Sequence, residues 1–136
     1  SFSTWSATNN LANGLAGDDD GDGLANGLEF FLGTNPKSPD GQSAGPSASL
    51  ALLDTGGGLT NHLVLSFRQN LVRHAAGSSW KVEGSPDLEH WTNAAFAPVL
   101  MDRTNHNDGT ATFRYRTARP AGADPQSFLR LRLSFP

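Results

Sequence analysis

Twelve residues near the N-terminus, Asp18 to Glu29, constrain the fold of this chain more than any other segment. They read D-D-D-G-D-G-L-A-N-G-L-E, and their side-chain oxygens have the spacing of a twelve-residue EF-hand calcium loop. Gly23 stands where such a loop turns sharply. The loop therefore predicts a Ca²⁺ site. Its expected ligands are Asp18, Asp20, Asp22, the backbone carbonyl of Leu24, Asn26 and Glu29.

Charge favours a bound cation over a solvated acidic loop. Residues 1–40 contain six acidic residues and only Lys37 as a base, whereas residues 41–136 contain nine lysines and arginines and seven acids. Four of the acids fall within residues 18–22, and carboxylates this close repel one another unless a cation lies among them. Because one Ca²⁺ would offset much of this excess, the charge pattern requires neither a nucleic acid partner nor insertion into a membrane.

Short helices are expected on both sides of the loop. Ser3 can cap a first helix that carries Phe2 and Trp5 on one face, and Asn13-Gly14 is a plausible end for it. A second helix is expected over residues 26–32, because Gly33 and the following proline end the pattern there. Its apolar face consists of Leu24, Leu28, Phe31 and Leu32.

The remainder of the chain predicts β-structure. A Pro/Gly/Ser-rich linker at 37–48 separates the helix–calcium loop–helix unit at 1–36 from residues 49–136. Apolar and polar residues alternate at 63–68, 80–83, 113–116 and 129–135, and weaker strand signals lie at 49–53 and 96–101, with a turn signal at 107–109. We therefore expect a mainly β fold, an antiparallel β-sandwich preceded by a short N-terminal helical EF-hand-like calcium motif.

Catalytic motifs are not evident, so we do not expect an enzyme. The 136-residue chain has no cysteine, which excludes disulfides and thiolate metal sites. It has no G-x-S-x-G nucleophile elbow. The histidines are scattered without metal-ligand spacing, and we expect surface or loop positions for them. They are His62, His74, His90 and His106.

The tryptophans separate two classes of function. Trp80 is in phase with Val82, and Trp91 follows the apolar Leu88, so we expect both in the core and Trp5 between the helical unit and the β-domain. A carbohydrate-binding module would instead need exposed tryptophans as stacking platforms.

Four arginines lie at alternate positions of two predicted strands. They are Arg114 and Arg116 in one strand and Arg130 and Arg132 in the other. If these strands were neighbours, the four guanidinium groups would gather on one wet face and would need partners. The partners could be local acids such as Glu83 and Glu89, an anionic polysaccharide, or the acidic N-terminal unit of another copy.

Several motifs together resemble the C-terminal modules of secreted verrucomicrobial bacterial proteins, which pair an EF-hand or thrombospondin-type-3-like calcium segment with a small β-domain. The motifs are F-x-x-W at 2–5, the calcium loop, L-E-F-F-L-G-T-N-P at 28–36, V-E-G-S-P-D-L-E-H-W at 82–91 and F-L-R-L-R-L at 128–133. The chain departs from these modules at Gly84, where a larger residue is usual, and at Trp80, where tyrosine is common.

The resemblance implies a non-catalytic, extracellular or cell-surface module that binds Ca²⁺. Such a module would serve surface attachment or self-assembly of a secreted bacterial protein, with neighbouring domains or copies of itself as partners. The alternative is a carbohydrate-binding module of a secreted enzyme.

Overall fold

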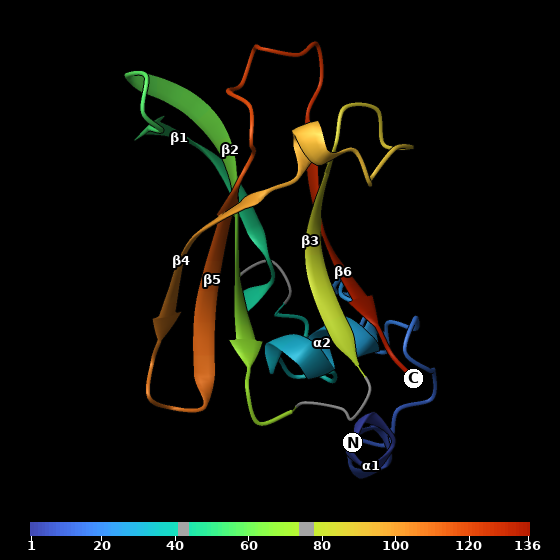
Figure 1. Ribbon diagram of the computed structural model, residues 1–136. Coiled ribbons are helices and arrows are strands. Elements are labelled where there is room, and N and C mark those ends of the chain that lie inside the picture. Colours follow the sequence, from blue (N-terminus) through green and yellow to red (C-terminus); the bar gives the residue numbers. More distant parts are fainter. Residues whose placement is uncertain (41–43, 74–77) are drawn as a thin grey trace.

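The computed structural model describes residues 1–40, 44–73 and 78–136, and it shows six strands in two antiparallel sheets after two short α-helices (Figure 1). The elements are α1 (Phe2–Thr8), α2 (Asn26–Leu32), β1 (Ser47–Asp54), β2 (Leu59–Asn70), β3 (Ser79–Ser85), the 3₁₀ helix η1 (Ala94–Phe96), β4 (Val99–Asn105), β5 (Thr110–Arg116) and β6 (Phe128–Ser134). This confirms the predicted mainly β, antiparallel fold. Residues 41–43 of the predicted linker lie outside the described residues.

The larger sheet has the order β1-β2-β5-β4, and β3 pairs with β6 in the smaller one. The predicted turn at 107–109 joins β4 to β5, and Asn107 and Gly109 have φ angles of 58° and 86° there. Asparagine and glycine tolerate this left-handed backbone conformation better than other residues do. The weaker strand signal at 96–101 marks the end of η1 and the start of β4.

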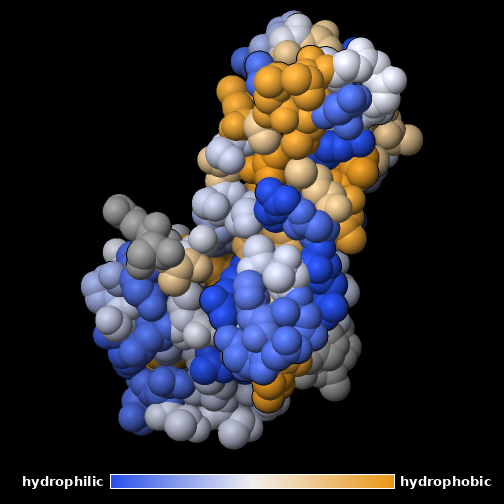
Figure 2. All heavy atoms as spheres, turned by 90° about the vertical axis from the view of Figure 1, so that its left-hand side faces the viewer, coloured by the Kyte–Doolittle hydropathy of each residue, from blue (hydrophilic) through white to orange (hydrophobic). Residues whose placement is uncertain are grey.

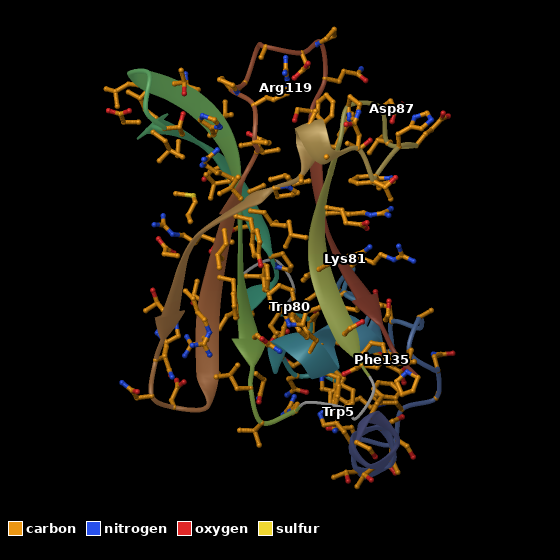
Figure 3. All side chains as sticks on the ribbon, in the orientation of Figure 1. Trp5, Trp80, Lys81, Asp87, Arg119 and Phe135 are labelled. Atoms are coloured by element: carbon orange, nitrogen blue, oxygen red, sulfur yellow. The ribbon has the colours of Figure 1, made fainter. Side chains whose placement is uncertain are left out.

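The core lies between the sheets and is closed at one end by α2 (Figure 1). Alternation places Phe67 of β2 and Phe113 of β5 on the same face, where their rings stack with centroids 5.6 Å apart. Trp80 of β3, labelled in Figure 3, meets Phe113 edge to face with ring centroids 4.9 Å apart, and its ring also contacts Phe31 of α2 with centroids 6.0 Å apart. The core position predicted for Trp80 is confirmed, whereas Trp91 is not part of this cluster.

The second helix has the predicted bounds, and Gly33 ends it in the left-handed conformation with φ of 84°. The first helix differs from the prediction. Ser1 rather than Ser3 caps it, and it ends at Thr8, well before residues 13–14. Asn10 has a positive φ of 52°, which ends the helical path early.

The N-terminal helix is attached through aromatic rings. The ring centroids of Trp5 and of Phe30 in α2 are 5.3 Å apart. The ring centroid of Phe2 lies 5.7 Å from that of Phe30 and 6.2 Å from that of Phe135, near the C-terminus. Figure 3 shows Trp5 and Phe135 in this region. Trp5 therefore holds α1 against α2, and Phe2 joins it to the end of the chain. Within the described residues, no helix is long and apolar enough to span a membrane.

Gly84, one of the positions where the chain departs from the modules it resembles, has no room for a side chain. A Cβ atom there would lie 2.1 Å from the carbonyl oxygen of Phe96. We expect Gly84→Ala to lower the free energy of unfolding by about 1–3 kcal/mol, because η1 must move away from β3. Gly57→Ala is the control, since nothing lies within 4 Å of that position. Urea unfolding measures both, and equal midpoints would contradict the close approach.

Candidate calcium site

The acidic loop brings three carboxylates together. Ligand oxygens of Asp18, Asp20 and Asp22 lie within 4.8 Å of one another. The loop backbone shapes this cluster, because Asp18 accepts hydrogen bonds from the N–H groups of Gly21 at 2.7 Å and Gly23 at 2.9 Å. The bond from Gly23 is the main reason why the pKa of Asp18 is lowered.

A second group of carboxylates shares one member with the first. Oxygens of Asp22, Glu29 and Asp40 also lie within 4.8 Å of one another. Glu29 comes from α2 and is completely buried, while Asp40 comes from the segment after that helix. Asp22 thus connects two groups that together contain five carboxylates.

The arrangement carries a strong electrostatic cost without a cation. Two unit charges 4.8 Å apart repel by about 3–4 kcal/mol at an effective dielectric constant of roughly 20. Burial, with the charges of Asp20 and Asp22, raises the pKa of Glu29 to about 7. Burial also raises the pKa of Asp20. Both raised pKa values mean that the ionised form of these carboxyl groups is disfavoured when no cation is bound.

Two buried oxygens at the site fit a bound metal ion. Oδ2 of Asp20 and Oε2 of Glu29 have no hydrogen-bond partner among the described residues. The other oxygen of Glu29 accepts a hydrogen bond from Thr34 Oγ1 at 3.3 Å. Buried polar atoms are almost always satisfied in native proteins, and oxygen-only ligand sets suit the hard cation Ca²⁺. The residues therefore fit calcium.

Asp40 is absent from the ligands expected from the sequence. The twelve-residue loop pattern ends at Glu29, and Asp40 reaches the site only because the chain turns back after α2. The only signal in the sequence is the pair of terminators, Gly33 and Pro36, which predicts that the chain changes direction between the two acids.

Asn26 has a different environment from the one expected for a ligand. Its side-chain amide donates to the carbonyls of Asn13 and Gly14, both at 3.1 Å, and to Asp19 Oδ1 at 2.9 Å. Its Oδ1 accepts from the N–H of Asp19 at 3.2 Å. These hydrogen bonds of the Asn26 side chain connect the start of α2 to the loop and to the segment before it. Coordination by the Leu24 carbonyl stays a prediction.

Asp19 is not part of either carboxylate group, and it connects the loop to the preceding segment. It accepts hydrogen bonds from the N–H groups of Ala12 at 2.7 Å and Asn13 at 3.2 Å, and Lys37 lies 3.6 Å away. The hydrogen bond from Asn26, followed by the one from Ala12, holds the pKa of Asp19 well below its usual range. Asp19 therefore has a structural role in the loop rather than a place among the clustered carboxylates.

The four arginines do not form one patch, because β5 and β6 belong to different sheets. This corrects the expectation of neighbouring strands. Guanidinium nitrogens of Arg130 and Arg132 lie 2.9 Å and 3.9 Å from Oε1 of Glu83. Glu83 is one of the local acids that the sequence offered as partners. Arg114 pairs with Asp102 through Nε at 2.9 Å.

The last of the four, Arg116, donates to the carbonyl of Thr117 at 3.1 Å. Each guanidinium group therefore has a partner within the chain.

His62 is buried, which contradicts the surface position expected for the histidines. Its Nδ1 lies 2.9 Å from the Thr117 carbonyl, which can only accept, so Nδ1 carries the proton. Nε2 lies 2.9 Å from the hydroxyl of Thr60. His62 is thus a buried histidine with a hydrogen-bond partner at each ring nitrogen, and His74 lies outside the described residues.

The remaining histidines are exposed, as predicted. One of them, His90, forms a third group of possible metal ligands with Asp87 and Glu89. All three are exposed, and Nδ1 of His90 already lies 2.5 Å from Asp87 Oδ2. A salt bridge explains this group without a metal ion.

Comparison with known proteins gives a match for the residues of the calcium site but none for the rest of the chain. No curated protein and no solved structure matches the sequence. The resemblance to verrucomicrobial modules therefore stays a prediction. Residues 18–39, which contain four of the five clustered carboxylates, match the family model of the bacterial TSP3 repeat, a calcium-binding thrombospondin-type-3-like repeat.

Proposed function

We propose that this chain is a non-catalytic, extracellular calcium-binding structural module. Its Ca²⁺ would join the acidic loop, α2 and the segment that ends at Asp40 into one rigid unit. Neighbouring domains or copies of the chain are its proposed partners.

The observation that carries the proposal is the position of Glu29. This buried carboxylate lies in the same short helix as Phe31 and Leu32, which belong to the hydrophobic core between the sheets. An ion held by Glu29 is therefore coupled to the packing of the β-sandwich through a single turn of helix. Calcium would stabilise the whole domain rather than a peripheral loop.

Two further points support an extracellular setting. TSP3 repeats are structural calcium-binding modules that occur in extracellular proteins. Extracellular calcium modules bind with dissociation constants of about 10⁻⁴–10⁻³ M, so millimolar external calcium fills them.

The alternative, carbohydrate binding, has weaker support. Trp5 and Trp80 contact other aromatic rings, and the guanidinium of Arg130 covers Trp91 at 3.9 Å from its centroid. A sugar would have to displace that guanidinium to stack on the covered face of Trp91. The structural proposal requires no such rearrangement.

Asp40→Asn tests the proposed site at the ligand that the loop pattern does not contain. We expect calcium affinity, measured by isothermal titration calorimetry, to fall by roughly tenfold or more, because one charged ligand is lost. Asp54→Asn is the control, since Asp54 is exposed at the end of β1 and lies outside the carboxylate groups. Unchanged affinity in Asp40→Asn would remove Asp40 from the site, and no heat of binding in the unsubstituted protein would refute the proposed function.

A further inference from the structure

The edge strand β1 differs from the other sheet edges. The strands β3, β4 and β6 carry charged residues within them, for example Lys81, Asp102 and Arg130, and β4 also has an irregular register between Leu100 and Asp102. Inward charges and bulges are the usual means by which proteins prevent edge-to-edge pairing. In contrast, β1 is S-A-S-L-A-L-L-D, without proline, and pairs with β2 in unbroken register over all eight residues.

The outer side of β1 is available for pairing. Its backbone has no hydrogen-bond partner besides β2 in the part of the chain that the structure describes. Leu50 and Leu52 of this strand are 65% and 58% exposed, and Leu59, opposite Asp54 on β2, is 65% exposed. Figure 2 shows apolar atoms gathered at the upper end of the molecule, where Figure 1 places the turn between β1 and β2.

We propose that β1 is a self-association edge, which pairs antiparallel with β1 of a second copy and joins two four-stranded sheets into one. Antiparallel pairing of identical strands requires a twofold axis perpendicular to the sheet, and this axis keeps the same face of both copies on the same side. The proposed axis passes midway between Ala51 and Ala51 of the second copy, which therefore lie opposite each other.

This register is the one that buries both leucines. Leu50 then lies opposite Leu52 of the second copy, and Leu52 opposite its Leu50, so four leucine side chains meet on one face of the joined sheet. Directly opposed side chains on a sheet face are about 4.5–5.5 Å apart at Cβ, and apolar pairs there stabilise the pairing. Shifting the axis to Leu50 would instead place Leu52 opposite Ala48.

Charge also permits the pairing. The only charged side chain of β1 is Asp54, at its end, and it would lie opposite Ala48 of the second copy. The two Asp54 residues would be about 20 Å apart along the strands, six residues at a rise of ~3.4 Å each. That separation exceeds the Debye length of about 8 Å at physiological ionic strength, so their repulsion is screened.

The interface is small, which predicts a reversible dimer. Two paired strands with four central leucines fall in the class below about 1,200 Å² of buried surface, which is typical of weak, transient complexes. We expect association in sedimentation velocity as calcium-loaded protein approaches millimolar concentration. Leu50→Lys/Leu52→Lys should weaken it at least tenfold, because like charges would then face each other.

Leu88→Lys is the matched control, since Leu88 is 58% exposed but lies in a loop far along the chain from β1. Circular dichroism and calcium titration should be unchanged in both variants, because neither touches the carboxylate groups. A protein that stays monomeric throughout, or one whose association is unaffected by the β1 lysines, overturns the proposed dimer and leaves the calcium site standing. The monomeric result would assign the exposed leucines to a different partner.

A single cysteine tests the register directly, because the chain has none of its own. Opposed residues have Cα atoms about 4.5–5.5 Å apart, within the range that a disulfide spans. Ala51→Cys should therefore form a cross-linked dimer under mild oxidation. Ser49→Cys is the control on the same strand and face, and its two thiols would be about 14 Å apart. Equal cross-linking of the two variants, or none in Ala51→Cys, would exclude this register.

Discussion

The effect of Glu29→Gln on the free energy of unfolding should depend on calcium. Without the ion, we expect the variant to be as stable as the original protein or more stable, whereas with Ca²⁺ it should lose most of the stabilisation that the ion provides. The carboxylate of Glu29 is buried, and this burial, followed by repulsion from Asp20 and Asp22, raises its pKa to about 7. Glutamine has the same shape, relieves the repulsion and can donate to the neighbouring carboxylates. It also removes the charged, potentially bidentate ligand on which calcium affinity depends.

The expected size follows from mass action. At calcium concentrations of about 10–100 times the dissociation constant, the bound ion stabilises the fold by about 1.4–2.7 kcal/mol. For a domain of this length the melting temperature should rise by roughly 5–10 °C. Thermal melts in EDTA and in calcium, with Glu89→Gln as an exposed control, measure both halves of the prediction. A variant that gains as much from calcium as the original protein would show that Glu29 is no ligand.

The same argument fixes the direction of the pH dependence. A carboxyl whose pKa is raised on folding stabilises the ion-free protein below the unfolded pKa of about 4.5, and this contribution is lost as the pH rises through about 7. A calcium ion bound by Glu29 would take the place of this proton. The stabilisation by calcium should therefore be larger at about pH 8 than at about pH 5, and Glu29→Gln should reduce this difference.

Local signals in the sequence were sufficient for individual elements. The second helix has its predicted bounds because Gly33 can adopt the left-handed conformation that ends it. The alternating segments are strands, and the turn at 107–109 joins two of them. In each case the deciding interactions lie within a few residues of one another, so the pattern contains the information.

Contacts between distant segments were not predictable in this way. Alternation shows which side chains share a face but not which strand lies alongside, and β6 pairs with β3 rather than β5. Asp40 reaches the carboxylates through a change of chain direction, and the buried ring of His62 is hydrogen-bonded to Thr117, 55 residues away. The core position expected for Trp91 rested on the apolar Leu88 before it, but both residues lie in a loop after β3, and Trp91 is not part of the core cluster.

Trp80 and Trp91 should therefore differ in how far their removal lowers the free energy of unfolding. Trp80 contacts Phe31, Phe67 and Phe113 in the core, whereas Trp91 lies outside it beneath the guanidinium of Arg130. We expect Trp80→Ala to lower the free energy of unfolding by about 3–5 kcal/mol, since it leaves a cavity among rings that cannot close on it. That loss is a large part of the 5–15 kcal/mol typical of a domain.

Trp91→Ala should cost about 1 kcal/mol, the usual size of a partly exposed cation–π contact. It would also uncouple Arg130 from the ring while leaving the ion pair of Arg130 with Glu83 in place. Urea unfolding at saturating calcium gives both free energies, and acrylamide quenching of each variant reports on the tryptophans that remain. Trp91→Ala should leave a population that resists quenching, since Trp5 and Trp80 pack against other rings. Equal destabilisation by the two substitutions would instead indicate that Trp91 belongs to the core, as the sequence predicts.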